Sequence, residues 1–304
     1  MRSIPPVPLL AAALSILIAP GLIAPGIARA EPPLIHPLCV QQLAAMVDFH
    51  FLSQVDEPLA AAECNRSYSA TPPVEIQGEV ASAEAEGAAE VRPPFYEYRV
   101  AGRHEGVALL DVAEGTGGTG IFSALVFVDG WPEGDLIGDD VRLRQVGVLE
   151  GGDRCNGGIA EVSVDGPLLR LGERLTPFDL FIFRPTRAVR KDRVRGFYEA
   201  IENTGTDLVS DKLTALEPYE DLDTAAASCT GAATTEFDLD AGTARLVSIT
   251  VTGLADEDPE WVARHRHQAC FNKVVKEAVR IFPKTLAPLQ VRALAEIFET
   301  ECLR

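Results

Sequence analysis

The sequence predicts an α+β fold: a β-rich central sandwich or open barrel with flanking helices and a disulfide-linked C-terminal helical hairpin. Short apolar runs between residues 95 and 183 are separated by Gly and Asp, which is typical of antiparallel strands. Residues 258–302 carry two apolar stripes with helical spacing, one of Phe271, Val274, Val275, Ala278, Val279 and Phe282 and one of Val291, Leu294, Ala295, Phe298 and Cys302. Six cysteines, an even number, follow a segment that resembles an export signal, so disulfides are expected.

The first 30 residues have the pattern of a secretory signal peptide. Arg2 supplies a basic start, residues 9–19 form an apolar stretch, and Ala28-Arg29-Ala30 places small residues at positions −3 and −1 of a cleavage site. An uncleaved membrane anchor is the alternative, because no charge interrupts residues 3–28. Two proline–glycine pairs in this stretch favour a cleaved leader. We therefore expect no membrane span in the chain after cleavage.

The composition indicates an acidic exported protein. Removing residues 1–30 removes two arginines and no acid, which takes the formal net charge from −18 to −20. Such a surface repels phosphate backbones and anionic lipids, so nucleic acid is excluded as a partner. Arginine outnumbers lysine 22 to 5 and alanine is abundant, a bias common in bacteria with GC-rich genomes. The expected location is periplasmic or secreted.

The N-terminal part of the mature chain reads as helical and then as a connection. Residues 31–64 are expected to form a helical segment, with a second short helix starting at Asp56-Glu57-Pro58. Residues 65–94 read as a linker or edge segment. Its Ala- and Glu-rich part, residues 79–90, has no apolar stripe and predicts a solvated segment or an edge hairpin.

A β-rich domain over residues 95–185 and an α/β C-terminal domain over residues 186–304 complete the prediction. In the β-rich domain, turn residues separate the apolar runs. Its expected strands cover residues 96–100, 107–112, 121–128, 141–149, 159–164 and 168–171. The second is expected to contain apolar helical faces over 194–201 and 208–216, a hairpin over 236–252, and helices from 258 and from 288.

One disulfide follows from helix geometry. Cys270 lies 13 residues before Pro283, which ends one helix, and Cys302 lies 14 residues after Pro288, which begins the next. At ~1.5 Å per residue, the two cysteines reach the same height in an antiparallel hairpin. This spacing predicts a Cys270–Cys302 bridge.

The other four cysteines are paired by weaker reasoning. Cys39 and Cys64 bracket the two expected N-terminal helices and are predicted to pair. Cys155 and Cys229 then remain, and they are paired by elimination. Oxidised cysteines are structural, so none of the six is a candidate nucleophile or metal ligand.

A basic stretch over residues 184–195 stands out in this acidic chain. Arginine side chains bind carboxylate and phosphate groups with two parallel hydrogen bonds, so the stretch is a candidate docking site for an anion or an acidic partner. Internal neutralisation by the acidic residues of 202–223 is the favoured alternative. The candidate residues are Arg184, Arg187, Arg190, Lys191, Arg193 and Arg195.

Some motifs resemble cofactor or metal sites but lack the neighbouring structure or ligand positions that such sites require. We therefore expect neither a cofactor nor a metal ion. Residues 115–120 match G-x-G-x-x-G, but a β-like run follows them and a hairpin loop is favoured. Residues 238–242 begin like a calcium loop but lack its glycine and glutamate positions, so a tight turn is favoured. His265 and His267 point in different directions on a helix, and His104 is isolated in the sequence. Asp135, Asp139 and Asp140 read as a solvated loop.

The missing motifs favour a non-catalytic function. The chain contains no G-x-S-x-G, S-x-x-K, H-E-x-x-H, Walker A or C-x-x-C pattern. The leading hypothesis is a periplasmic or secreted binding module whose partner is an envelope protein or another extracytoplasmic component. A secreted hydrolase that uses two carboxylates and a structural envelope protein are the alternatives. The sequence leaves the oligomeric state open.

Overall fold

A computed structural model describes most of the chain after residue 34. The signal peptide, the helical faces expected over 194–216 and the start of the helix expected at 258 lie outside the described residues. The described residues are 35–45, 58–68, 74–77, 80–84, 93–115, 120–133, 137–182, 188–189, 229–241, 243–252, 266–282 and 284–302.

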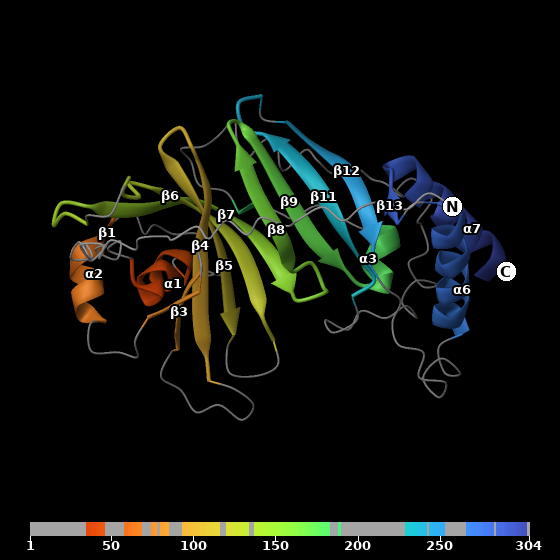
Figure 1. The fold of residues 1–304 in the computed structure, drawn as a ribbon, viewed down its shortest axis with the longest axis horizontal. Coiled ribbons are helices and arrows are strands. Elements are labelled where there is room, and N and C mark those ends of the chain that lie inside the picture. Colours follow the sequence, from red (N-terminus) through yellow and green to blue (C-terminus); the bar gives the residue numbers. More distant parts are fainter. Residues whose placement is uncertain are drawn as a thin grey trace, which may run out of the picture.

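The first sheet is a curled, antiparallel half-barrel, in the order β1-β7-β6-β5-β4-β3-β2, with β10 also paired to β7 (Figure 1). The short β2–β3 hairpin forms one edge and overlaps the segment 79–90, expected to be solvated or an edge hairpin, only at β3. The strands are β1 (Leu59–Ala60), β2 (Glu75–Gln77), β3 (Val80–Glu84), β4 (Phe95–His104), β5 (Val107–Gly115), β6 (Phe122–Asp129), β7 (Arg142–Asp153) and β10 (Ala188–Val189).

The second sheet is antiparallel and joins two hairpins that are far apart in the sequence. Its order is β13-β12-β11-β9-β8, and β9 pairs with β11 over their whole lengths. The domain boundary predicted at residue 185 lies between these two strands and stays a prediction. The strands are β8 (Ile159–Asp165), β9 (Leu168–Leu175), β11 (Gly231–Asp238), β12 (Thr243–Val251) and β13 (Thr285–Leu286). A short helix, α3 (Pro177–Ile182), follows β9.

Two short helices open the described chain, and the second begins later than expected. Helix α1 covers Pro37–Ala45 and α2 covers Ala61–Ser67. The helix start predicted at Pro58 is wrong because Leu59 and Ala60 are extended and pair with β7 opposite Leu143 and Arg142. This pairing joins segments about 80 residues apart, so no local pattern reveals it.

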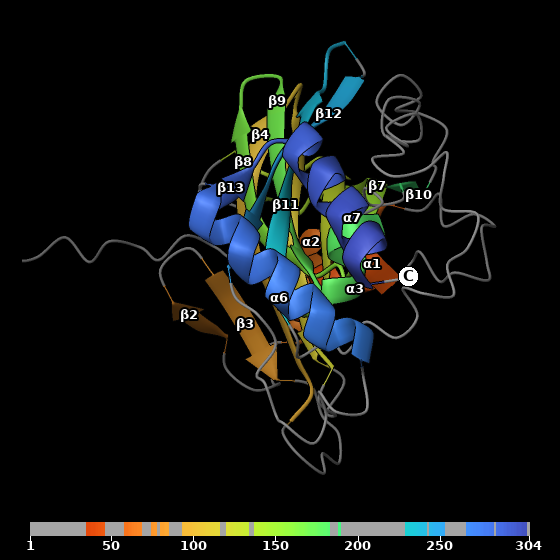
Figure 2. The same cartoon turned by 90° about the vertical axis from the view of Figure 1, so that its right-hand side faces the viewer.

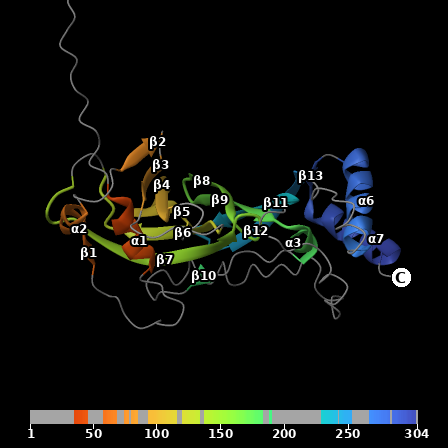
Figure 3. The same cartoon turned by 90° about the horizontal axis from the view of Figure 1, so that it is seen from below.

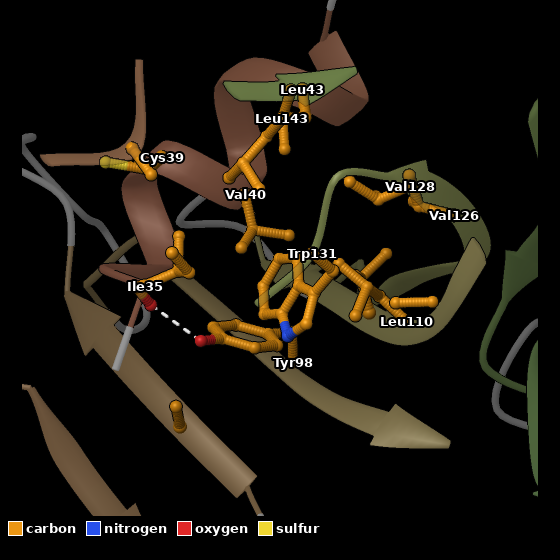
Figure 4. Packing of buried hydrophobic residues seen from close by; sticks show 14 of the residues in the cluster. Ile35, Cys39, Val40, Leu43, Tyr98, Leu110, Val126, Val128, Trp131 and Leu143 are labelled. Atoms are coloured by element: carbon orange, nitrogen blue, oxygen red, sulfur yellow. Dashed lines mark hydrogen bonds between the residues drawn. The ribbon is translucent and has the colours of Figure 1, made fainter. Parts of the chain in front are cut away.

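Three hydrophobic clusters follow one another along the long axis of the molecule (Figures 1 and 3). The first packs α1 and α2 on the first sheet. Figure 4 shows its centre, where the Tyr98 hydroxyl donates a 2.6 Å hydrogen bond to the carbonyl of Ile35 and its ring meets Trp131 edge-on. Burial raises the pKa of the Tyr98 hydroxyl, which therefore remains a hydrogen-bond donor.

The second cluster in this series joins the two sheets. It contains Leu109, Leu125 and Phe127 of the first sheet together with Leu171 and Phe237 of the second. The sheets also approach closely at Gly102, where an added Cβ would lie 2.4 Å from the Cβ of Val164. The two sheets therefore share a core, which confirms the predicted α+β arrangement with a β-rich centre.

A helical hairpin packs on the far end of the second sheet (Figure 2). It consists of α6 (Arg266–Ile281) and α7 (Pro288–Cys302), and β13 lies in the connection between them. Val291, Leu294, Ala295 and Phe298 of α7 are buried, as the predicted stripe requires. This packing forms the third cluster.

The structure pairs all six cysteines in the predicted way. Cys270–Cys302 links α6 to α7 with a Cα–Cα distance of 5.7 Å. Cys39–Cys64 links α1 to α2 at 5.9 Å, and Cys155–Cys229 links the starts of the two hairpins of the second sheet at 4.8 Å. Three disulfides indicate an extracytoplasmic protein. Within the described residues, no helix has both the length and the apolar character needed to cross a membrane.

Candidate functional site

The helical hairpin has a buried face and a second apolar face that is left exposed. The buried faces meet at Phe271 and Phe298, whose rings make an edge-on contact with centroids 6.2 Å apart. The exposed side chains are large. They are Ile281, Phe282, Leu289 and Ile297, with exposed fractions of 71%, 43%, 77% and 44%. Water-exposed apolar groups gathered on one element are typical of a binding surface.

A groove of about 270 Å³ lies between α6 and α7 and takes in three of these exposed side chains. Along α6 it extends from Lys273 to Phe282, a distance of about 14 Å at the rise of an α-helix. Its lining is mostly apolar. The lining residues are Lys273, Val274, Glu277, Ala278, Ile281, Phe282, Leu286, Gln290, Ala293, Leu294, Ile297 and Glu301.

The groove has a charged end and an uncharged end. Lys273 and Glu301 lie within one turn of the disulfide, and Glu277 follows one turn further along α6. At the other end, where the helices are connected, Phe282 and Gln290 carry no charge. The groove thus offers apolar contacts along its length and two carboxylates at one end, of which Glu277 forms a 3.2 Å ion pair with Arg280.

Two sequence features explain why the groove exists. Phe282 was expected on the core face of α6, but the helix ends at Ile281 and the Phe282 side chain lies at the groove instead. This part of the predicted stripe is wrong: the backbone N–H of Phe282 still donates to the carbonyl of Ala278 at 2.8 Å, as in the last helical turn, but the residue is 43% exposed. The outward positions Ile281 and Ile297 were outside both predicted stripes, and large apolar residues off a stripe were the signal that could have revealed the groove.

A second cluster lies where the tips of two hairpins meet. His104 and Glu105 belong to the β4–β5 hairpin, and Asp240 belongs to the β11–β12 turn. The Nε2 atom of His104 is 3.2 Å from Oδ1 of Asp240, and the possible metal-binding atoms of the three residues all lie within 4.8 Å of one another. His104 and Asp240 are 136 positions apart, so the sequence alone could not bring them together.

The motif that resembled a cofactor site joins two antiparallel strands, and the motif that resembled a calcium loop begins at a turn. Strand β5 ends at Gly115 and its antiparallel neighbour β6 begins at Phe122, so the glycine motif connects a hairpin. In the acidic turn, Oδ1 of Asp238 accepts hydrogen bonds from the backbone N–H groups of Asp240 and Ala241, at 3.1 and 2.8 Å. This side chain is engaged in holding the turn.

Only two residues of the basic stretch 184–195 are among the described residues. Ala188 and Val189 form β10, which pairs with β7. The candidate docking residues lie outside the described residues, so their docking role stays a prediction: Arg184, Arg187, Arg190, Lys191, Arg193 and Arg195.

The remaining candidate ligands of the sequence are dispersed. Asp135 and His265 lie outside the described residues, and His267 is buried in α6. Asp139 forms an exposed 3.2 Å ion pair with Arg66. These residues therefore do not gather around one point.

Among the described residues, two carboxyl groups have raised pKa values, but they lie on separate elements. Burial raises the pKa of Asp111 on β5, against the opposing effect of its partner Arg99 at 2.9 Å. Burial also raises the pKa of Asp179 on α3, whose carboxylate accepts a 2.6 Å hydrogen bond from the Thr176 hydroxyl. Each carboxyl group is held by its own neighbour, which is an arrangement typical of structural roles.

Compared with protein-family models, with curated proteins and with solved structures, the chain has no significant match.

Proposed function

We propose that the protein is a non-catalytic extracytoplasmic binding module that receives an amphipathic helix of a partner protein between α6 and α7. The observation that carries this proposal is the apolar groove on the disulfide-linked hairpin. The partner is an envelope protein or another extracytoplasmic component with a basic residue near one end of its apolar stripe.

The dimensions of the groove suit a helix. Its length of about 14 Å corresponds to two and a half helical turns, enough for apolar side chains at positions i, i+4 and i+7. Its volume of about 270 Å³ is just below the range of pockets that enclose small molecules, roughly 300–1,000 Å³. A third helix laid between two antiparallel helices also covers Ile281 and Ile297, which otherwise face water.

The charges favour a basic partner over two other occupants. Glu301 lies at the charged end of the groove, Glu277 is already paired with Arg280 at 3.2 Å, and the whole chain carries a formal net charge of −18. Anionic lipid and a second copy of the chain are both repelled by this excess of negative charge. A helix with a lysine or arginine opposite Glu301 is attracted.

The hairpin is rigid enough to act as a preformed receptor. The Cys270–Cys302 bridge fixes one end, and the pairing of β13 with β12 fixes the connection at the other. Because the groove does not have to form during binding, the entropy cost of association is reduced.

Site-specific photo-cross-linking from Ala293, in the cells that make the protein, tests the proposal. We expect the cross-link to lie in one amphipathic helix with a basic end, and a synthetic peptide of that helix to bind the purified protein. A lipid adduct, a link to a second copy of the chain, or no adduct from a folded and exported protein would overturn the proposal.

Two matched substitutions distinguish a loss of peptide binding at the groove from a general effect of an added surface charge. Ile297→Glu places a charge among the apolar lining and should weaken peptide binding by tenfold or more, roughly 1.4 kcal/mol. Val247→Glu adds the same charge at a similarly exposed apolar residue on β12, outside the groove, and should bind as the unchanged protein does. Equal losses in both variants would contradict a role for the groove.

A further inference from the structure

We infer that the tips of the β4–β5 and β11–β12 hairpins form a binding site for a divalent transition metal, best suited to Zn²⁺. Its ligands are the imidazole of His104 and the carboxylates of Glu105 and Asp240. The two hairpins belong to different sheets and lie away from helices α6 and α7 (Figure 1).

The distances agree with shared coordination of one ion. Two ligands bound to a tetrahedral zinc at ~2.0–2.1 Å are about 3.3 Å apart. Nε2 of His104 and Oδ1 of Asp240 are 3.2 Å apart, so an ion can be bound by both with little movement. Glu105 is exposed, and its carboxylate lies within 4.8 Å of the other two ligand atoms, a gap that rotation of a free side chain can close.

The donor set selects the kind of metal. One imidazole nitrogen with two carboxylates suits zinc and related transition metals, whereas Ca²⁺ and Mg²⁺ prefer oxygen ligands alone. Asp240 has 60% of its side chain exposed, while His104 has 15%. The imidazole is therefore held by the protein, and the carboxylate side is open for an ion to enter with water as its fourth ligand.

The packing of the two sheets holds the ligands in place. Ala101 and Val107, on either side of the β4–β5 turn, pack against the same cluster that contains Phe237 and Leu239 beside the β11–β12 turn. Both turns are thus fixed by one core, and a metal bound across them would link the first sheet to the second. Removal of one of three ligands should weaken binding by at least tenfold, as loss of supporting contacts alone does.

Zinc titration of the oxidised, metal-stripped protein tests this inference. We expect one equivalent of Zn²⁺ to bind by calorimetry and to raise the melting temperature by about 3 °C or more at saturation. Ca²⁺ and Mg²⁺ at equal concentration should leave it unchanged.

The variants distinguish this site from other histidines and from a simple ion pair. His104→Gln and Asp240→Asn should each raise the Kd for Zn²⁺ at least tenfold. Asp165→Asn removes a carboxylate from the neighbouring β8–β9 hairpin tip, outside the cluster, and should bind Zn²⁺ normally. Absence of zinc binding, or unchanged binding in His104→Gln, would overturn the inference and leave His104–Asp240 as an ion pair only.

Discussion

Glu236 is a charged residue buried in the middle of the second sheet. Its side chain is only 6% exposed, and its two oxygens accept hydrogen bonds from Arg170 at 2.8 Å and from Arg245 at 2.9 Å. These hydrogen bonds hold the pKa of the Glu236 carboxyl below its ordinary value, against the opposing effect of burial. The carboxylate lies between the side chains of two strands, β9 and β12, that do not pair with each other.

This arrangement predicts a pH-dependent contribution to stability. Because the pKa is lower in the folded state, the stabilisation is complete above the unfolded-state pKa of the carboxyl and is lost as pH falls through the folded-state pKa. Glu236→Gln should lower the free energy of unfolding by about 1 kcal/mol at neutral pH, a value reduced for the exposure of both arginines.

Urea unfolding of both proteins at neutral and at acidic pH measures this contribution. The difference between the unchanged protein and Glu236→Gln should shrink as the pH falls. A difference that stays constant with pH would show that the charge of Glu236 does not stabilise the fold.

At the residue scale, the sequence indicated which side chains could form turns or bind ligands, but it did not indicate which distant residues lie next to them. The turn at Asp238 was predicted correctly because its hydrogen bonds reach only two and three residues ahead. His104 was left as isolated because its partner Asp240 comes from another hairpin. Contacts that depend on how two sheets pack are outside the reach of local patterns.

At the scale of elements, the prediction succeeded where periodicity and spacing acted together. Helix α7 lies where its apolar stripe placed it, and the equal distances from Cys270 and Cys302 to the turn identified their bridge. The start of α2 was wrong because Leu59 pairs with Leu143 instead of joining the helix. The exposed apolar residues on α6 and α7 were not predicted as a binding surface, because an apolar stripe indicates only the buried face of a helix.

The disulfides should differ in their contributions to stability. In the chain-entropy model, a bridge restricts the unfolded chain more when it closes a longer loop. Cys155–Cys229 spans 74 residues and Cys270–Cys302 spans 32. Replacing the first pair by alanine should therefore cost about 0.7 kcal/mol more than replacing the second.

Urea denaturation of the two double-alanine variants measures this difference. The variant without Cys155–Cys229 should have the lower midpoint at equal slope. The reverse order would show that loop length does not determine the contribution of these bridges.

At the scale of the whole molecule, the central cluster makes the two sheets dependent on each other. Strand β9 pairs with β11 along its length, and Phe237 and Leu239 complete the core beneath the first sheet. The sequence predicted the β-rich centre, but it grouped strands by their order along the chain. The predicted Cys155–Cys229 bridge brought the starts of the two hairpins together, but no sequence pattern showed that β11 and β12 complete a sheet begun by β8 and β9.

A fragment of residues 31–185, with Cys155→Ser, tests the predicted domain boundary. It lacks β11 and leaves β9 as an edge strand, so apolar side chains of the shared core become exposed. We expect the fragment to unfold without a cooperative transition and to bind hydrophobic dyes, in contrast to the mature chain. A monomeric fragment with a sharp thermal transition would establish residues 31–185 as an independent domain.

The three bridges are also consecutive along the chain, because the first cysteine pairs with the second, the third with the fourth and the fifth with the sixth. A chain that enters an oxidising compartment with its N-terminus first presents its cysteines in the order of their native pairs. Oxidation during translocation would then produce the native pattern directly. We therefore expect oxidative maturation of this protein to depend on an oxidant for its thiols and to proceed at the same rate without an enzyme that rearranges disulfides, which oxidative refolding with and without such an enzyme would measure.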